Sequence, residues 1–489
     1  MTELLIGIQT ALTFDALLFC LIGVTVGTLV GMLPGIGSLT TISLLLPLTY
    51  HADPTLAIIM FAGIYYGANY GGSISSITTN VPGTPSTAVS CVDGYPMFRK
   101  GRGGPALFLT AIASFVGGMV GLAVVAFLSP MVAQAALFFS PADYFAIMLL
   151  SLTVAATTAA ESLIRNFIAI SLGLALGLIG IDINTALPRY DFGLNALSDG
   201  INIAVITVGM FGLAEVINNI TNRRNHINSI HYNTMKPSSE EWKLFRWPAL
   251  RGAGIGSIFG SLPGIGPATS ALVAYSVEKK ISKNPEKFGK GAVEGLVAPE
   301  SSNNAAVQSA FVPTLTLGIP GDAVMILILA ALMLHGIVPS VTIMETQPEL
   351  FWGVVASFLI GNVMLLFLNI NLISVWIRIL SMPYELLYPI IVTVIGIGVY
   401  SINNSIADII MVAAFGVVGY LLKLMRFELT LILLGFVLGP LIEDNLRKTL
   451  IIARGDVSAF FAHPISAVLL CVTILLIVKN LFTHQKKDN

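Results

Sequence analysis

Apolar runs of helix length recur along the whole chain, and they limit its possible folds more than any other feature. Residues 105–128 read PALFLTAIASFVGGMVGLAVVAFL, and residues 465–478 read ISAVLLCVTILLIV. A helix needs about 20 such residues to cross the hydrocarbon core of a bilayer. Only 10% of the 489 residues are charged, whereas soluble domains carry about 25%. The sequence therefore predicts an all-α polytopic membrane protein with about 10–12 spans.

Basic residues are unevenly distributed along the chain, and their distribution predicts an orientation. Residues 1–98 contain no Lys or Arg. Basic side chains gather instead in the segments 99–102, 218–251 and 279–290. Because basic loops are retained in the cytoplasm, we expect these three segments inside, and residues 51–54 and 336–350 outside.

One loop occurs twice in the chain. Residues 31–37 read GMLPGIG, and residues 260–266 read GSLPGIG. We call them the first and second LPGIG loops. Proline removes a helix donor and glycine permits unusual backbone angles, so each loop interrupts an apolar helix.

The surroundings of the two loops predict opposite orientations. The second loop lies between two basic segments expected on one side, which indicates a re-entrant hairpin, whereas the first has no basic neighbours. We therefore predict two inverted-topology repeats, each with a re-entrant hairpin and a broken transmembrane helix. The N-terminal repeat is residues 1–217, the cytoplasmic linker 218–251, and the C-terminal repeat 252–489.

Each predicted repeat also contains a polar segment that is broken by a Pro-Gly pair. These segments are YYGANYGGSISSITTNVPGTPS (65–86) and APESSNNAAVQSAFVPTLTLGIPGD (298–322). Free N–H groups at a helix break attract anions such as carboxylates. Free carbonyls, with Ser, Thr and Asn oxygens, hold cations such as Na⁺. A single Pro-Gly break would indicate packing or a kink, but matched breaks in both halves predict a transport site.

Two carboxylates, Glu300 and Asp322, lie in the second polar segment. An ionisable group inside a bilayer marks a functional site by default. Each could hold a cation or relay a proton, and the alternative is a carboxylate that caps a half-helix. The sequence contains no GxxxxGK[ST], HExxH or GxSxG motif, and its three cysteines lie far apart. We therefore expect neither an enzyme, nor a metal site, nor a nucleic-acid partner.

GMLPGIG, IYYGANYGGSISSITTNVPGTPS, DGYPMFRKGRGGPAL, APESSNNAA and TLGIPGD together resemble the large membrane (permease) subunit of the tripartite tricarboxylate transporters. The resemblance implies a multi-pass protein of the bacterial inner membrane, a secondary active transporter for di- or tricarboxylates. It implies coupling to an ion, Na⁺ or alternatively H⁺. It also implies two partners, a small membrane subunit of about four spans and a periplasmic solute-binding protein that delivers the substrate.

Carried over position by position, the resemblance implies a substrate site formed by the two LPGIG loops and the polar segments. Its members are Pro34, Gly35, Gly37, Ser38, Asn80, Pro82, Gly83, Thr84, Pro263, Gly264, Gly266, Ser301, Ser302, Asn303, Asn304, Gly318, Pro320 and Gly321. It implies a coupling-ion site at Asn80, Asn303, Asn304, Glu300 and Asp322, with no other cofactor.

One atypical position leaves the exact function open. Asp322 follows GIPG, where the family pattern has a small neutral residue, so neither the particular carboxylate nor the choice between Na⁺ and H⁺ is fixed. A passive carboxylate channel and a non-transporting assembly subunit are the alternative functions. The oligomeric state is not indicated by the sequence.

Overall fold

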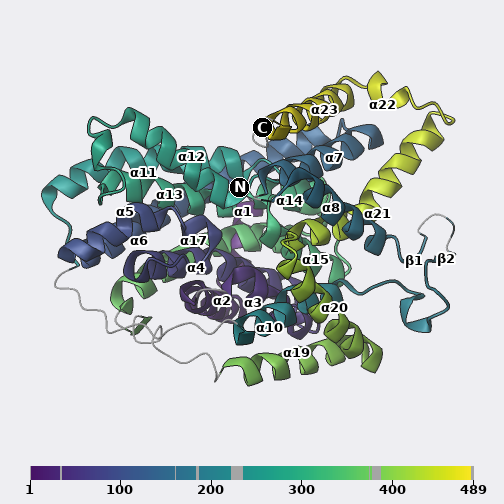
Figure 1. The fold of residues 1–489 in the computed structure, drawn as a ribbon, viewed down its shortest axis with the longest axis horizontal. Coiled ribbons are helices and arrows are strands. Elements are labelled where there is room, and N and C mark those ends of the chain that lie inside the picture. Colours follow the sequence, from purple (N-terminus) through teal and green to yellow (C-terminus); the bar gives the residue numbers. More distant parts are fainter. Residues whose placement is uncertain are drawn as a thin grey trace. The chain divides into compact units, whose positions relative to one another are not determined.

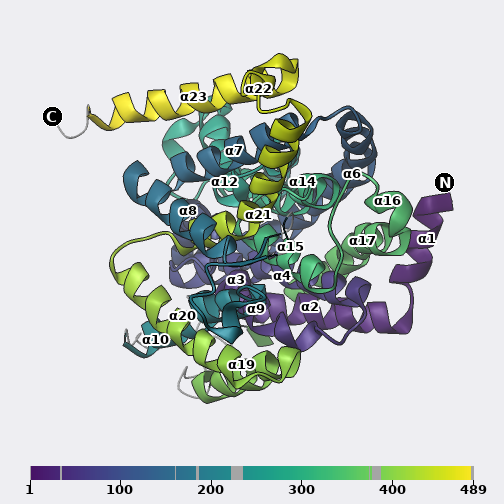
Figure 2. The ribbon, with the colours of Figure 1, turned by 90° about the vertical axis from the view of Figure 1, so that its right-hand side faces the viewer.

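The chain is helical almost throughout. The structure is a computed structural model and describes residues 2–33, 36–159, 161–182, 185, 187–221, 235–373, 375–376 and 387–485. Within these residues the strands are one short antiparallel pair, β1 (Gly180–Ile181) and β2 (Pro188–Arg189). Figures 1 and 2 show the helices from two directions.

Six helical stretches of the described chain are long and apolar enough to cross a membrane. They are Phe14–Met32, Ser90–Ala136, Pro141–Thr158, Pro348–Asn371, Ile406–Leu424 and Leu429–Ile452. Shorter apolar helices cover Leu163–Gly177, Ile203–Asn218, Ala323–Leu334, Val392–Asn403 and Pro464–Asn480. The predicted class, an all-α polytopic membrane protein, is therefore confirmed.

The chain forms two compact units, and each takes one segment from each half of the sequence. Unit 1 contains residues 1–132 and 219–394, and unit 2 contains residues 133–218 and 395–489. Each unit thus combines parts of both predicted repeats. The division into repeats 1–217 and 252–489 with a linker stays a prediction, and residues 222–234 of that linker lie outside the described residues.

Unit 1 holds both LPGIG loops and both polar segments. Its helices in the first half are α1 (Thr2–Ala11), α2 (Phe14–Met32), α3 (Gly37–Leu45), η1 (Pro47–Thr49), α4 (Pro54–Thr79), η2 (Pro85–Thr87), α5 (Ser90–Met97), η3 (Phe98–Arg102) and most of α6 (Gly103–Ala136). Those in the second half are α11 (Ser239–Gly260), α12 (Gly266–Ile281), η6 (Pro285–Lys287), α13 (Val293–Ser309), α14 (Phe311–Leu317), α15 (Ala323–Leu334), α16 (Ile343–Thr346), α17 (Pro348–Asn371) and the start of α19 (Leu387–Asn403).

Two helix pairs in unit 1 pack through the same glycine pattern. Helix α2 lies along α4, and α11 lies along α13 (Figure 1). Gly23, Gly27 and Gly31 of α2 face the backbone of Met60, Ile64 and Ala68, and Gly252, Gly256 and Gly260 of α11 face that of Ala298, Ser302 and Ala306. A Cβ at any of these glycines would overlap a carbonyl oxygen of the facing helix. The spacing of four residues puts each set on one helix face and lets the backbones approach closely.

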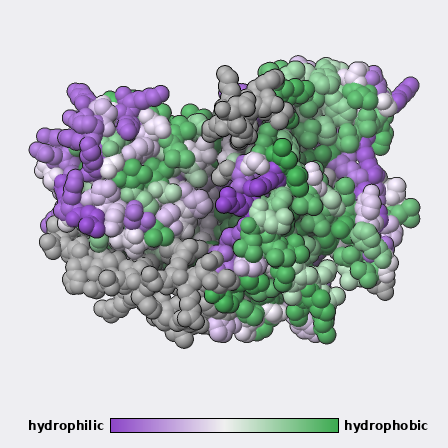
Figure 3. Space-filling view, viewed as in Figure 1, coloured by the Kyte–Doolittle hydropathy of each residue, from purple (hydrophilic) through white to green (hydrophobic). Residues whose placement is uncertain are grey.

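The three basic segments meet on one face of unit 1. Lys100 Nζ donates to the Lys290 carbonyl oxygen at 2.6 Å, and Arg102 forms an ion pair with Glu241. Hydrophilic residues gather at this place in the space-filling view, over the ends of α5, α11 and α12 (Figure 3). The segments therefore share a side, as the prediction requires.

Unit 2 is built around the crossing of two helices. Its elements are the end of α6, α7 (Pro141–Thr158), α8 (Leu163–Gly177), β1, β2, η4 (Asn195–Leu197), α9 (Ile203–Thr207), η5 (Val208–Leu213), α10 (Ala214–Thr221), the rest of α19, α20 (Ile406–Leu424), α21 (Leu429–Ile452), α22 (Ala459–Ala462) and α23 (Pro464–Gln485). Helix α8 packs on α21, and α23 runs along α7 (Figure 2).

The contacts between α8 and α21 are reciprocal. Gly173 of α8 faces Ile432 of α21, whereas Gly435 of α21 faces Ile170 of α8. One turn further on, Gly177 faces Phe436 and Gly439 faces Leu174. Gly173 of α8 thus corresponds to Gly435 of α21, and Ile170 corresponds to Ile432. Each glycine contacts the isoleucine of the other helix, as a local twofold axis between the helices produces.

Candidate functional site

Both polar segments break a helix at a left-handed residue. Helix α4 ends at Asn80, with φ 58°, and α14 ends at Gly318, with φ 69°. Glycine and asparagine are the residues that tolerate this conformation at a helix C-terminus. We call residues 80–83 and 318–321 the first and second Pro-Gly turns.

Each Pro-Gly turn is held close to its own helix. A Cβ at Gly83 would lie 2.7 Å from the Gly72 Cα, and one at Gly321 would lie 2.9 Å from the Ala310 Cβ. Small residues are therefore required at both turns. The turns differ in exposure, since Asn80 and Pro82 are exposed while Gly318 and Pro320 are buried.

The LPGIG loops lie beside these turns. In the second loop the Gly264 N–H donates to the Gly321 carbonyl at 2.9 Å, and Gly266, with φ 70°, packs beside Asp322. In the first loop Gly31 lies so close to Gly83 that a Cβ at Gly83 would overlap the Gly31 carbonyl oxygen. Pro34 and Gly35 lie outside the described residues.

The two halves of unit 1 meet around the turns. Helix α3, which follows the first loop, packs against α15, and α12, which follows the second loop, packs against η2. Gly37 opens α3 with φ 58° and Ser38 is buried next to it, while Pro263 of the second loop is half-buried. The helix N-termini of α3 and α12 therefore lie in the same region as the polar segments.

Asp322 caps a helix and binds a tyrosine. Its carboxylate accepts the N–H groups of Val324 at 2.8 Å and of Met325 at 3.1 Å, at the start of α15. It also accepts the hydroxyl of Tyr65 from α4. Asp322 thus occupies the positive end of α15 and connects the two polar segments.

Thr84 belongs to a buried hydroxyl network behind the first turn. Its Oγ1 lies 2.9 Å from Ser86 Oγ, and Ser86 in turn donates to Asn69 Oδ1. Thr84 and Thr87 also form a capping box at η2. These bonds fix the backbone that follows the first turn.

The polar side chains of α13 point to three different neighbours. Ser301 Oγ donates to the Ala249 carbonyl of α11 at 2.7 Å, and Ser302 Oγ lies 2.5 Å from Ser270 Oγ of α12. Asn304 Nδ2 donates to the Asn303 Oδ1 at 2.6 Å and to the Glu300 carbonyl at 3.0 Å. The predicted substrate residues of α13 are thus brought against both helices that flank the second loop.

Glu300 is fully buried among serine hydroxyls that the sequence analysis did not single out. Ser73 Oγ of α4 donates to Oε1 at 2.7 Å, and Ser90 of α5 donates to the same oxygen. Ser114 Oγ of α6 donates to Oε2 at 3.3 Å. Three helices therefore converge on this carboxylate.

The predicted ion residues separate into distinct places. Glu300, Asn303 and Asn304 are contiguous in α13, whereas Asp322 sits at α15 and Asn80 at the exposed first turn. Within the described residues, no group of three His, Cys, Asp or Glu side chains could hold a metal ion.

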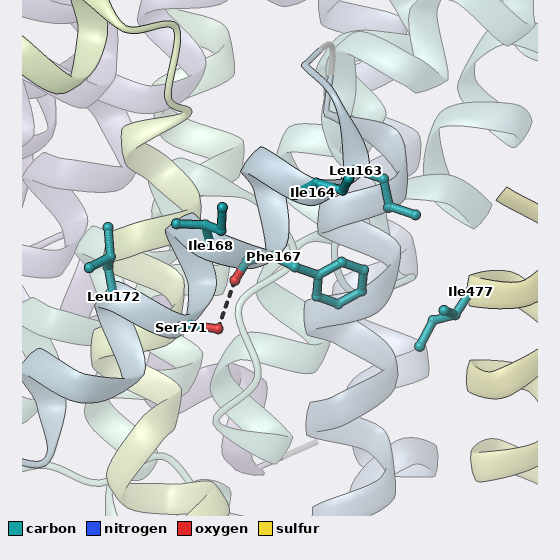
Figure 4. Close-up of a pocket in the computed structure, with 7 residues that line it drawn as sticks. All are labelled: Leu163, Ile164, Phe167, Ile168, Ser171, Leu172 and Ile477. Atoms are coloured by element: carbon teal, nitrogen blue, oxygen red, sulfur yellow. Dashed lines mark hydrogen bonds between the residues drawn. The ribbon is translucent and has the colours of Figure 1, made fainter. Parts of the chain in front are cut away.

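Two open cavities in unit 2 are apolar. One, of about 500 Å³, lies between α8 and α23 and is shown in Figure 4. Its single hydroxyl, that of Ser171, donates to the Phe167 carbonyl at 2.8 Å. The other, of about 670 Å³, is lined by Tyr190 and by apolar side chains of α8, η5, α20 and α21. Neither offers a cationic group to a carboxylate.

The chain matches one family model and two curated proteins. Residues 17–434 match the family described as the tripartite tricarboxylate transporter TctA family. The chain is 45% identical over 478 residues to an uncharacterized 52.8 kDa protein of the TAR-I ttuC' 3' region of Agrobacterium vitis, and the match covers 98% of this chain and 95% of that relative.

A second relative, from the TAR-II ttuC' 3' region of the same organism, is 48% identical over 235 residues, or 48% of this chain and 97% of that protein. No solved structure matches the chain significantly. The family match and the apolar helices make this a multi-pass membrane protein and a transporter subunit. The chain belongs to the tripartite tricarboxylate transporter TctA family, as the resemblance in its motifs predicts.

Proposed function

We propose that this subunit carries di- or tricarboxylates across the bacterial inner membrane, coupled to an ion gradient, with Na⁺ as the coupling cation. The observation that carries the proposal is the pair of left-handed Pro-Gly turns, Asn80–Gly83 and Gly318–Gly321, each packed against an LPGIG loop. We further propose that a periplasmic solute-binding protein delivers the substrate and that a small membrane subunit completes the complex.

The chemistry of the turns suits an anion and a cation together. Helices α3 and α12 begin at left-handed glycines, Gly37 and Gly266, so their N-terminal N–H groups are not hidden by a side chain there. Such N–H groups favour a carboxylate. The carbonyls that α4 and α14 leave free at their C-terminal ends favour a cation. Two inverted repeats would bring one set of each kind from each half.

The difference in exposure between the turns supports alternating access. The first turn is open at Asn80 and Pro82, whereas the second is covered by the second LPGIG loop and by Pro339, whose carbonyl oxygen would lie 3.2 Å from a Cβ at Gly318. A transporter exposes its site to one side at a time. We propose that the core with the LPGIG loops moves relative to the remaining helices during the cycle.

Uptake by proteoliposomes tests the proposal. The purified subunit, its membrane partner and its binding protein are reconstituted, and accumulation of labelled carboxylates is followed with and without an inward Na⁺ gradient. Accumulation above the external concentration supports secondary transport, and uptake that only equilibrates indicates the passive channel.

A pair of glycine variants tests whether the turns carry the substrate. Gly83→Ala places a methyl group on the Gly31 carbonyl, whereas Gly254→Ala adds one on the exposed face of α11, where nothing lies within 4 Å. The two variants are compared at equal amounts of assembled complex. We expect Gly83→Ala to lose uptake and Gly254→Ala to retain it. Equal uptake in the two assembled variants would favour the assembly-subunit alternative.

A further inference from the structure

Glu300 is a buried carboxylate whose charge has no counter-ion among the described residues. Its side chain is 0% exposed, and its described partners are three serine hydroxyls. Helices α4 and α6 contain no charged residue. The titratable groups that face it are Tyr70 of α4 and Cys91 of α5, both neutral in their ordinary form.

Two charged residues on the other surrounding helices, Asp93 and Arg251, already have partners. Asp93 of α5 accepts the N–H groups of Gly291 and Ala292, each at 2.7 Å. Arg251 of α11 pairs with Glu278 of α12 at 2.5 Å. No arginine or lysine of the described chain therefore forms an ion pair with Glu300.

An isolated charge at this depth is strongly disfavoured. Transfer of an ionised carboxylate from water to an apolar interior is so costly that the group takes a proton or a cation instead. Hydroxyl donors offset part of that cost but leave the net charge in place. The structure thus requires a compensating positive charge at Glu300 for at least part of the transport cycle.

The spacing of the oxygens favours a proton over a metal cation. Ca²⁺, which is close to Na⁺ in size, takes oxygen ligands at about 2.3–2.6 Å, so two ligands at right angles stand roughly 3.4 Å apart. Ser73 Oγ lies 2.7 Å from Glu300 Oε1, and the Ser90 hydroxyl also bonds that oxygen directly. A proton can bind the carboxylate once a serine hydroxyl rotates to accept it, with the oxygens staying in place, whereas a cation would have to part them.

Polar atoms without partners continue from Glu300 along one face of α13. Asn304 and Gln308 follow it at intervals of four residues, which places the three side chains in a row. Asn304 Oδ1, both polar atoms of Gln308 and the Tyr70 hydroxyl are buried without a hydrogen-bond partner. Buried polar groups of this kind bind internal water, and such water conducts protons.

We propose that Glu300 is a proton-binding site that takes up and releases one proton in each transport cycle, through the row formed by Asn304 and Gln308. This inference rests on the proposed function as a transporter. It assigns the Na⁺ role to other groups, and it makes Glu300 a second point of ion coupling.

The test uses Glu300→Gln in the reconstituted complex. This variant keeps the shape and loses the ability to ionise. We expect it to retain exchange of labelled for unlabelled carboxylate, with its Na⁺ dependence unchanged, and to lose the stimulation of uptake by an inward pH gradient. Wild-type stimulation in the variant would overturn the proposal, and so would a several-fold rise in the Na⁺ concentration needed for exchange.

Two further variants separate this role from a structural one. Thr110→Val removes another hydroxyl of α6, which is buried and without a partner, and should behave as wild type. Ser114→Ala removes one donor to the ionised carboxylate, so the midpoint of the pH dependence should move to higher pH. An unmoved midpoint would contradict the assignment.

A spectroscopic measurement covers the case in which Glu300→Gln does not assemble or the complex transports nothing. Infrared difference spectra of the wild-type complex between acidic and alkaline pH should show the C=O stretch of a carboxylic acid, and Ser114→Ala should shift that band while Thr110→Val leaves it in place. A band indifferent to Ser114→Ala would overturn the proton site. Failure of carboxylate uptake in a complex that shows the shifted band would refute the proposed function alone.

Discussion

Replacing Gly256 by alanine tests the close packing of α11 on α13, on which the placement of the second LPGIG loop depends. The Gly256 Cα faces the Ser302 backbone, and a Cβ there would overlap its carbonyl oxygen and lie 2.8 Å from the Ala305 Cβ. Because a backbone oxygen cannot turn aside as a flexible side chain does, the helices must separate. Gly254, two residues earlier in α11, is exposed and has nothing within 4 Å, so it is the matched control.

Both substitutions gain the helix propensity of alanine, but only Gly256→Ala also creates a steric clash. Alanine is favoured over glycine in a helix interior by about 1 kcal/mol, and both sites lie inside α11. Overpacking a close contact costs typically about 1–3 kcal/mol. We therefore expect Gly254→Ala to stabilise the protein slightly, and Gly256→Ala to be about 1–3 kcal/mol less stable than Gly254→Ala.

Thermal unfolding of the two purified variants in the same detergent measures this difference. The same preparations are then assayed for uptake, since a displaced α11 would also move the hydrogen bond from Gly264 to Gly321. A melting temperature of Gly256→Ala equal to that of Gly254→Ala, with equal uptake, would refute the reasoning. It would mean that α11 and α13 stand further apart than the glycine contacts indicate.

Three other substitutions have definite expected outcomes. Tyr65→Phe removes the hydroxyl that donates to Asp322. Thermal unfolding should show a free energy of unfolding that is lower by about 1–3 kcal/mol. An unchanged value would show that this bond does not stabilise the fold. Asn80→Gly keeps the left-handed turn, so the protein should stay folded. Because the amide is expected at the coupling ion, uptake should need a higher Na⁺ concentration, and an unchanged requirement would remove Asn80 from the ion site. Burial lowers the pKa of His335 from its usual 6.5, so the unfolded chain binds more protons below that pH. The melting temperature should therefore fall on acidification more steeply in wild type than in His335→Asn, and parallel curves would contradict this.

The helix breaks are the part of the site that the sequence predicts well. A Pro-Gly pair behind Asn80 or behind Gly318 leaves few backbone conformations, so the left-handed ends of α4 and α14 follow from local chemistry. The duplication of the LPGIG loop likewise marks the two loops that pack against these turns. Local chemistry also explains why Asp322 caps α15, an alternative that the sequence itself left open.

The surroundings of Glu300 could not be predicted from the sequence. Ser73, Ser90 and Ser114 lie on three helices, and each looks like an ordinary small residue in an apolar helix. Only the way in which these helices pack brings the hydroxyls to one carboxylate. The spacing of four in Gly23, Gly27 and Gly31 was visible, yet it does not name the helix that it faces.

The compact units were not predictable either, because they depend on contacts between distant parts of the chain. Unit 1 gathers both loops and both turns, and unit 2 gathers the crossing of α8 and α21. In the sequence, the two halves are separated by the basic linker. In the structure, each compact unit combines one segment from the first half with one from the second. The reciprocal contacts of Gly173 and Gly435 are an example of such pairing, while the inverted topology of the repeats stays a prediction.

The shared packing shows where the two halves differ chemically. Because the glycines of α2 and α11 contact equivalent positions, Met60 corresponds to Ala298 and Ile64 to Ser302. Between them, the counterpart of Glu300 is Ala62. In the same way Gly83 corresponds to Gly321, so the counterpart of Asp322 is Thr84. Glu300 and Asp322 therefore have no acidic counterpart in the first half. A duplicated scaffold can supply paired helix ends to an anion, but the proposed proton site also needs a carboxylate, and Glu300 has no acidic counterpart. On the proposed function, an ion step at Glu300 would therefore occur once per cycle, although the framework around it is repeated.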